Sequence, residues 1–243
     1  MITATNLTKT YKGITVLNIE HLEIPAGESF GLVGNNGAGK TTFFSLLLDL
    51  VPPSTGNIFN NEFTVSESED WKSFTSSFID DSFLIGYLTP EEYFYFIGQV
   101  RQQNRTDVDI LLAGFEEFFN GEITGKQKYL RDLSKGNQKK VGIVGTFIGN
   151  PKIIILDEPF ANLDPTSQIR LKKILKDKVE KRDTTFLISS HDLIHITGVC
   201  ERIVVLDKGV ITRDIKTSPQ TLRELENYFS GGVTQDDQAI NDV

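Results

Sequence analysis

The chain has 243 residues, which suits one compact unit with an inserted lobe better than two large domains. Hydrophobic residues make up 39% and charged residues 24% of it, which excludes a disordered chain. The net charge of −8 argues against a broad basic surface for nucleic acid and against direct attraction to anionic lipid. No apolar run approaches the ~18 residues of a membrane span. The N-terminus lacks a signal-peptide pattern, and Cys200 is the sole cysteine, so we expect a reducing cytosolic compartment.

The first part of the chain is predicted to contain short strands, a glycine-rich loop and one helix. Residues 17–24 alternate imperfectly between apolar and polar, as in a half-buried strand, and residues 29–33 form a short buried strand. A helix is expected over residues 40–50, and it ends at the turn of residues 52–56.

The character of the sequence changes between about residues 60 and 129, which indicates a helical lobe inserted between α/β elements. Within the expected domain, residues 1–215, we assign this lobe to about residues 85–145. Thr89, Pro90 and Glu92 form a helix-start pattern, with a Thr cap, Pro at the first helical position and Glu at the third. A further helical stretch is expected over residues 108–119.

The second half of the chain alternates apolar strands with helices, which predicts a parallel sheet covered by helices. Strands are expected over residues 152–157, 184–189 and 203–206, with helices over 164–182 and 192–199. A tight turn at 207–209 leads into another strand. Residues 216–243 form a C-terminal extension, and its last dozen residues, acidic and without a basic side chain, are expected to be disordered.

A glycine-rich segment between a predicted strand and a predicted helix carries the strongest chemical signal. It reads GNNGAGKTT from Gly34 to Thr42 and fits the spacing of a phosphate-binding loop. Glycines let backbone N–H groups surround phosphate oxygens, and the helix N-terminus adds partial positive charge. Lys40 can reach the β and γ phosphates, and Thr41 can ligate Mg²⁺. The predicted ATP-binding residues of this loop are Asn35, Asn36, Gly37, Ala38, Gly39, Lys40, Thr41 and Thr42.

Two adjacent carboxylates, Asp157 and Glu158, follow an apolar strand directly. The C-terminal end of a buried parallel strand lies on the side where α/β sheets bind ligands. Asp157 can therefore hold Mg²⁺ through water, and Glu158 is free to act as general base on a water molecule. A helix or turn cap is the alternative, but a neighbouring phosphate loop favours the metal and base roles.

With these motifs in place, the chain resembles the ATP-binding subunit of ATP-binding cassette (ABC) transporters over residues 1 to about 215. Residues 133–138, LSKGNQ, resemble the family signature, residues 161–164 the loop after the acidic pair, and residues 189–191 the histidine switch. The resemblance implies an α/β fold. Its parts are a P-loop NTPase core with a mainly parallel sheet, an N-terminal antiparallel β subdomain and the inserted helical lobe.

The resemblance also implies roles for individual residues. Tyr11 would stack on adenine, and His191 would contact the γ-phosphate. The signature would face the phosphate loop of a second subunit through Ser134, Lys135, Gly136, Asn137 and Gln138, so that two ATP molecules lie within a head-to-tail dimer. Considered alone, Ser134 is an ordinary helix cap, His191 a strand-end surface residue and Tyr11 a core or strand-face residue. The spacing leaves open which loop the signature faces.

Two departures from the family pattern affect the site. Lys135 stands where the commonest signature has glycine. The Gln that the family places between the core and the helical lobe is matched by an acidic segment, where Asp80 aligns best and Asp81 is the alternative. A carboxylate can bind a hard cation such as Mg²⁺, so Asp80 is a candidate metal ligand; a solvated loop residue is the other interpretation.

Together these features predict a Mg²⁺-dependent ATPase that hydrolyses ATP to ADP and phosphate as part of an exporter-type ABC transporter. The expected partners are a separate transmembrane permease and a second ATPase subunit, in a homodimer or a heterodimer, with no nucleic acid. The expected location is cytoplasmic, at the inner face of the membrane. A soluble ABC ATPase acting on ribosomes or nucleic acid is the alternative. The ribosomal type usually has two cassettes in one chain, and residues 60–130 are too short for the coiled coil of the DNA-repair type. A third class, a phosphate-loop protein without turnover, is disfavoured by Glu158.

Overall fold

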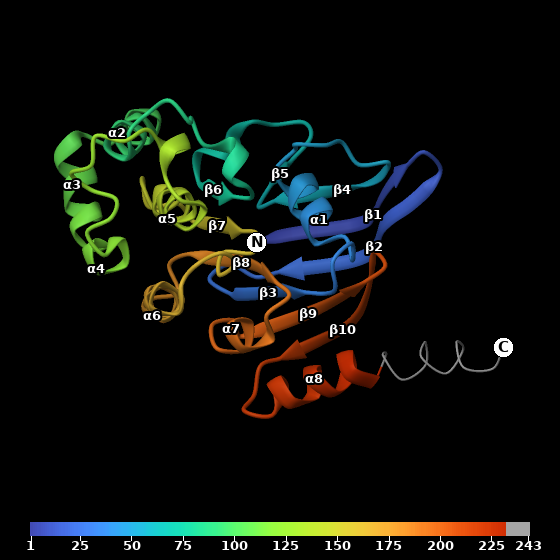
Figure 1. The fold of residues 1–243 in the computed structure, drawn as a ribbon. Coiled ribbons are helices and arrows are strands. Elements are labelled where there is room, and N and C mark those ends of the chain that lie inside the picture. The colour runs from blue at the N-terminus through green and yellow to red at the C-terminus, as the bar shows by residue number, and fades with distance from the viewer. Residues whose placement is uncertain (232–243) are drawn as a thin grey trace.

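Two β-sheets form the frame of the structure, a computed structural model that describes residues 1–231. A four-stranded sheet has the order β2-β1-β4-β5, and a six-stranded sheet has the order β10-β9-β3-β8-β7-β6. Figure 1 shows the N-terminal strands in blue beside the central sheet. The last twelve residues, where disorder was expected, lie outside the described residues.

The four-stranded sheet is antiparallel throughout and contains β1 (Ile2–Tyr11), β2 (Ile14–Ile24), β4 (Thr55–Asn60) and β5 (Phe63–Thr64). The strands before residue 25 are longer than expected, because β1 and β2 have ten and eleven residues, whereas the short buried strand expected over residues 29–33 is confirmed. Asn6 adopts a left-handed φ of 48°, and the register of β1 on β4 shifts at this point. The inward face of β1 therefore does not follow a simple alternation, which hid its length in the sequence.

The six-stranded sheet is mainly parallel, as predicted. The strands β3 (Ser29–Val33), β7 (Ile153–Leu156), β8 (Thr185–Ser190) and β9 (Arg202–Asp207) run parallel, whereas β10 (Val210–Lys216) is antiparallel to β9. Because Val33 pairs with Ser190 and Leu156 with Ile188, the carboxyl ends of three buried strands meet at one edge. The phosphate loop and the acidic pair follow these ends.

The sixth strand corrects the prediction that residues 60–129 are helical. Residues 75–78 form β6 (Thr75–Phe78), which pairs in parallel with β7 at the edge of the sheet. Its sequence, TSSF, has a single large apolar residue and therefore gives no apolar signal of its own. A short helical turn, η1 (Asp70–Ser73), precedes β6, and η2 (Asp81–Phe83) follows it.

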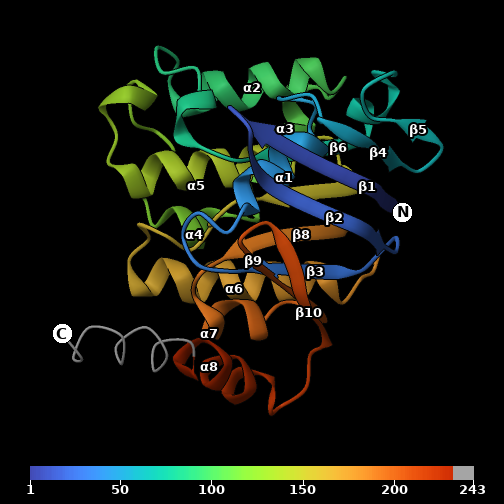
Figure 2. The ribbon, with the colours of Figure 1, turned by 90° about the vertical axis from the view of Figure 1, so that its right-hand side faces the viewer.

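Eight α-helices occur among residues 1–231. One group consists of α2 (Pro90–Val100), α3 (Arg105–Ala113), α4 (Glu116–Phe119) and α5 (Lys135–Gly145), with the turn η3 (Leu130–Asp132) before α5. The other helices are α1 (Lys40–Leu47), α6 (Pro165–Val179), α7 (Leu193–Thr197) and α8 (Thr221–Gly231). In Figures 1 and 2, α2 and α8 lie at opposite ends of the molecule. None of the helices within residues 1–231 combines the length and apolar character needed to cross a bilayer.

Several helix boundaries follow local chemistry. The pattern at Thr89 is confirmed as a full capping box, in which Thr89 and Glu92 each accept a hydrogen bond from the other's backbone N–H. The helix expected over residues 108–119 is split, because α3 ends at Ala113 before Gly114. The first helix ends at Leu47, earlier than expected, and Asp49 follows with a left-handed φ of 52°.

Two apolar cores pack on the two faces of the central sheet. Alternate residues of a buried strand point to opposite faces, so Ile154 and Leu156 join one core while Ile153 and Ile155 join the other. The first core is covered by α2–α8, and the second contains α1 and the antiparallel sheet. This packing fixes the strand ends from which the polar side chains of the site project.

Candidate nucleotide-hydrolysis site

The phosphate loop joins the end of β3 to the start of α1. Gly39 has a left-handed φ of 108° and directly precedes α1, where no side chain caps the helix. A Cβ atom on Gly34 would lie 2.3 Å from the carbonyl oxygen of Leu206, so only glycine fits there. The first backbone N–H groups of α1 therefore remain available to an anion, as the sequence predicted for a phosphate loop.

Lys40 connects this loop to the acidic pair. Its Nζ donates to the carbonyl oxygen of Gly34 at 2.7 Å and lies 3.5 Å from Oε1 of Glu158. The side chain is only 7% exposed. A buried ammonium group thus lies between the loop that can receive phosphate and the candidate base.

Asp157 is held by two hydroxyl groups. Thr41 Oγ1 donates to one carboxylate oxygen at 2.6 Å, and the hydroxyl of Ser189 donates to the other. Burial raises the pKa of Asp157 above its usual value, while these hydrogen bonds oppose the shift. Ser189 was identified in the sequence only within the histidine-switch segment; the structure adds it as a direct partner of the metal-binding candidate.

Glu158 has cationic or polar groups at both carboxylate oxygens. Oε2 lies 2.9 Å from Nδ1 of His191, and Oε1 faces Lys40. The backbone of Glu158 has a left-handed φ of 48°, an uncommon conformation for a side chain of this size. The structure therefore brings the two predicted catalytic residues, Glu158 and His191, into direct contact.

A cavity of about 500 Å³ lies in front of the acidic pair. Thr41, Asp80, Asp157 and Glu158 all line it. The carboxylate of Asp80 accepts a hydrogen bond from the Ser82 backbone N–H at 2.8 Å, and hydrogen bonding to the side chain and the backbone of Ser82 lowers the pKa of Asp80. Asp80 thus remains ionised at the cavity while it caps the turn η2.

The oxygen donors of this cavity suit Mg²⁺ in company with phosphate. Within residues 1–231, no group of three or more His, Cys, Asp or Glu side chains could hold a metal ion by itself. Mg²⁺ usually binds through one or two carboxylates, water and substrate phosphates, and it does not require an all-protein cage. The touching oxygens of Thr41 and Asp157 form such a partial ligand set.

Lys139 is a site residue that the sequence interpretation missed. Its Nζ donates to the carbonyl oxygen of Glu158 at 2.8 Å, and the residue is 8% exposed. It also lines the cavity. The available signal was its spacing: Lys139 lies four residues after Lys135, hence on the same face of the predicted helix.

The signature residues divide between an exposed helix start and a buried support. Ser134 caps α5, since its hydroxyl accepts a hydrogen bond from the Asn137 N–H at 3.3 Å. Gln138 points inward and donates to the carbonyl oxygens of Leu130 and Leu133 at 2.9 and 3.1 Å. Gln138 therefore supports the segment before the helix, while Ser134 and its neighbours stay at the surface.

Three further residues of the sequence analysis, Lys135, Gly136 and Tyr11, do not line the nucleotide cavity. Lys135 Nζ lies 3.5 Å from a carboxylate oxygen of Asp81, and a Cβ on Gly136 would lie 2.9 Å from the Asn162 carbonyl oxygen. Tyr11 ends β1 with 46% exposure and has Lys9 Nζ 4.8 Å from its ring centre. This exposure contradicts the interpretation of Tyr11 as a core residue and agrees with the alternative, a residue on the face of a strand.

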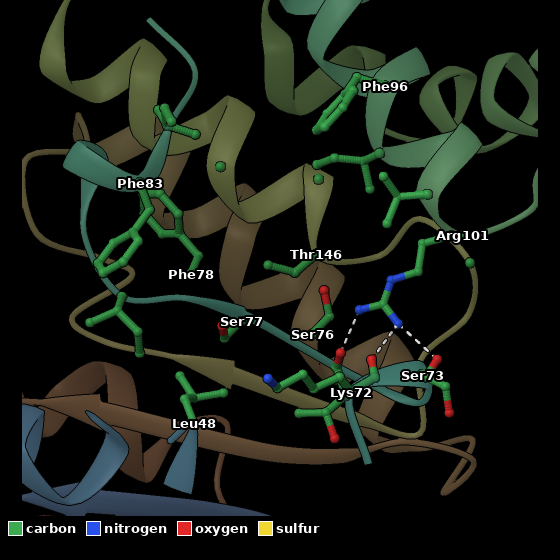
Figure 3. Close-up of a pocket in the computed structure, with 18 of the residues that line it drawn as sticks. Leu48, Lys72, Ser73, Ser76, Ser77, Phe78, Phe83, Phe96, Arg101 and Thr146 are labelled. Atoms are coloured by element: carbon green, nitrogen blue, oxygen red, sulfur yellow. Dashed lines mark hydrogen bonds between the residues drawn. The ribbon is translucent and has the colours of Figure 1, made fainter. Parts of the chain in front are cut away.

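A larger groove adjoins the nucleotide cavity. It has a volume of about 830 Å³ and lies between β6 and the helices α2 and α5, as Figure 3 shows. Phe83 and Phe96 line it with exposures of 60% and 45%. The groove and the nucleotide cavity share three lining residues, which are Leu50, Ile79 and Phe83.

Comparisons with known proteins agree with this geometry. The family described as "ABC transporter" matches residues 17–161. The lipopolysaccharide export system ATP-binding protein LptB of Escherichia coli is 34% identical over 86% of this chain and 87% of its own. An uncharacterized ABC transporter ATP-binding protein of Bacillus subtilis, YhaQ, is 31% identical over 86% of this chain and 69% of its own. A solved dimer of the ATP-binding cassette MJ0796, in a post-hydrolysis state with ADP and phosphate, superimposes with a TM-score of 0.76. It is 26% identical, and the alignment covers 90% of this chain and 99% of that one.

Proposed function

Because this chain belongs to the ABC transporter family and is an ATP-hydrolysing cassette of that family, we propose that it drives export through a separate transmembrane permease. Its family relatives are ATP-binding subunits of transporters, and one of them serves an export system. The proposal places the chain at the inner face of a membrane, held there by its permease.

The chemistry of ATP hydrolysis assigns one role to each group of the site. The phosphate loop and Lys40 bind the β and γ phosphates, and Lys40 exchanges its contact with Glu158 for one with phosphate. The carboxylate of Glu158 accepts a proton from the water that attacks the γ-phosphorus. His191, 2.9 Å from Glu158, orients that carboxylate and contacts the departing phosphate.

Mg²⁺ is the proposed cofactor. Thr41 and Asp157 would hold it, and Asp80 is a further candidate on the same cavity. When bound, Mg²⁺ neutralises phosphate charge that would otherwise repel the attacking water and the carboxylates. Asp157 suits this role because its ionised form is costly when buried and is stabilised by a cation.

The proposed assembly is a head-to-tail homodimer. Ser134, Lys135, Gly136 and Asn137 lie at the exposed start of α5, where backbone N–H groups and a hydroxyl can receive the γ-phosphate of ATP bound to a second subunit. The dimeric cassette with 26% identity supports this arrangement.

The proposal of a permease partner rests on the wall that the groove shares with the nucleotide cavity. Ile79 and Phe83 line both the groove and the nucleotide cavity. A permease segment bound in the groove and a nucleotide bound in the cavity would therefore contact the same loop, residues 79–83. Exposed aromatic rings beside polar strand edges suit an amphipathic helix or loop of a membrane protein. A photoreactive phenylalanine at position 96 tests the proposal, because Phe96 lies in the groove (Figure 3).

The expected result is a light-dependent crosslink from position 96 to a protein with several membrane spans. The matched control is the same replacement at Ile169, an apolar residue of α6 that is 70% exposed and does not line the groove. Crosslinks to ribosomal proteins, or no crosslink above the control, would contradict the permease assignment.

A further inference from the structure

The backbone of Glu158 is held in an uncommon conformation by three hydrogen bonds. Its N–H donates to Ser189 Oγ at 3.0 Å. Its carbonyl oxygen accepts from Lys139 Nζ at 2.8 Å and from the backbone N–H of Ala161 at 3.2 Å. A non-glycine residue keeps a left-handed φ, here 48°, only where its surroundings impose it. Lys139 supplies the one bond of this set that carries a charge.

Acidic side chains surround the ammonium group of Lys139, since Asp80, Asp81, Asp157 and Glu158 line the same cavity as this lysine. Burial lowers the pKa of Lys139, and four carboxylates oppose that shift, of which Asp81 acts most strongly and Glu158, Asp157 and Asp80 follow. Asp81 also pairs with Lys135, one helical turn before Lys139, at 3.5 Å. Its Oδ1 is buried and has no hydrogen-bond partner within residues 1–231, so a nearby positive charge offsets the cost of burying it.

This arrangement links the two spaces of the molecule. Asp81 begins η2, the turn that continues into Phe83 on the wall of the groove. Lys139 lies on α5 and reaches Glu158 in the nucleotide cavity. Lys135 and Lys139 of α5 carry two positive charges, and Asp80 and Asp81 of this loop carry two negative charges that balance them.

We propose that Lys139 is a positioning residue for Glu158: its ammonium group holds the Glu158 backbone in the left-handed conformation, and Asp81 holds the ammonium group. The inference rests on the proposed role of Glu158 as general base. Loss of the ammonium group lets the Glu158 backbone relax, so the carboxylate no longer meets the attacking water. Displacement of a reacting group by about 1 Å can lower a rate by about 100-fold.

The test compares Lys139→Met, Lys139→Arg and Glu158→Gln in steady-state ATPase assays of the full chain with Mg²⁺ and ATP. We expect Lys139→Met to lower kcat by about 10- to 100-fold while KM for ATP and the affinity for a fluorescent ATP analogue stay within about threefold. Lys139→Arg keeps the charge and a donor, so it should recover part of kcat. Lys140→Met is the matched control, since Lys140 is the next residue of α5, is similarly buried and pairs with Glu122.

A second measurement separates positioning from a general loss of structure. Asp81→Asn should lower kcat in the parent but add nothing in a Lys139→Met background, because its effect passes through Lys139. Thermal unfolding of each variant identifies any loss of fold, and a crystal structure of Lys139→Met reports whether φ of Glu158 leaves the left-handed region.

The outcomes separate the role of Glu158 as general base from the positioning role of Lys139. If Glu158→Gln retains turnover, both the base assignment and this inference fail. If Glu158→Gln is inactive but Lys139→Met stays within twofold of the parent, or its φ at Glu158 is unchanged, only the inference fails. A tenfold or larger loss of nucleotide affinity in Lys139→Met would overturn it in favour of a direct phosphate contact.

Discussion

At the scale of single residues, Glu158 is the side chain whose loss should separate binding from turnover. The change Glu158→Gln preserves size and hydrogen bonding to His191 but removes the proton acceptor. General-base catalysis typically contributes about 10²- to 10⁴-fold, so ATP hydrolysis should fall by that factor while ATP binding persists. Steady-state hydrolysis and nucleotide binding measure the two effects, and size-exclusion chromatography should detect an ATP-dependent dimer. Turnover within a few-fold of the parent would exclude Glu158 as the base.

Asp157 illustrates a conflict between activity and stability. Its pKa is raised in the folded chain, so the ionised form lowers the free energy of unfolding at neutral pH. The variant Asp157→Asn should remove that penalty and raise Tm, by about 2–4 °C for each 1 kcal/mol gained in a chain of this size. It should also abolish Mg²⁺-dependent ATP hydrolysis.

The pH dependence of this effect has a definite sign. The penalty on the parent chain is fully present above the raised pKa of folded Asp157 and vanishes below the ordinary Asp pKa of about 3.9. The Tm difference between Asp157→Asn and the parent should therefore be largest near pH 7 and shrink towards pH 4. Differential scanning calorimetry without nucleotide measures it, and a difference that grows on acidification would contradict the assignment.

At the scale of elements, Arg101 at the end of α2 joins the helices of the groove to the edge of the central sheet. Its guanidinium group donates to three backbone carbonyl oxygens, those of Lys72, Ser73 and Thr75 (Figure 3). Hydrogen bonds that involve a charged group are worth about 1.5–3 kcal/mol each when made inside a protein, although they do not add fully.

The variant Arg101→Lys should therefore lower the free energy of unfolding by about 1–3 kcal/mol. Arginine reaches the three carbonyl oxygens through the separate N–H groups of its planar guanidinium, whereas the single ammonium group of lysine cannot reach all three. The midpoint of urea unfolding measures the change. Arg105→Lys serves as control, since the guanidinium group of Arg105, at the start of α3, stacks on the partly buried ring of Tyr95 and does not join the helices to the sheet. Equal midpoints for the two variants would show that Arg101 does not secure this junction.

Sequence patterns predicted the elements with strong apolar or capping signals. The strand before Asp157, the capping box at Thr89 and the loop around Lys40 needed only local information. The strand β6 was not predicted, because its polar sequence forms a strand only through hydrogen bonds to the neighbouring strand β7. The helix α8 was also missed, although its sequence carries a signal: Leu222, Leu225 and Phe229 recur at helical spacing, and Leu225 and Phe229 pack on the first core.

In the candidate site, too, the sequence predicted the residues of local motifs but not the contacts that depend on the fold. The order of motifs along the chain predicted that Lys40, Thr41, Asp157, Glu158 and His191 share one site, and the structure places them together. The contact of Lys139 with a backbone carbonyl could not be predicted, because it depends on how α5 crosses the acidic pair. Likewise, only the fold shows that Gln138 points inward.

At the scale of the whole molecule, the signature and the phosphate loop should act together across two copies. The variant Ser134→Arg places a bulky charge at the start of α5, and Lys40→Ala removes the phosphate contact. Each variant alone should fail to trap nucleotide. A mixture contains heterodimers in which one site has both an intact Lys40 and an intact Ser134, so trapping should return. Trapping no better in the mixture than in either variant would indicate a site complete within one chain.

The wall formed by Leu50, Ile79 and Phe83 has one more consequence, because it belongs to two binding spaces at once. Equilibrium thermodynamics makes this coupling reciprocal. If bound ATP raises the affinity of the groove for a permease segment tenfold, then the bound segment raises the affinity for ATP tenfold, a coupling free energy of about 1.4 kcal/mol. The same reasoning applies to any occupant of the groove that shifts this wall. A small apolar compound bound beside Phe83 would therefore change the affinity for ATP without touching a phosphate.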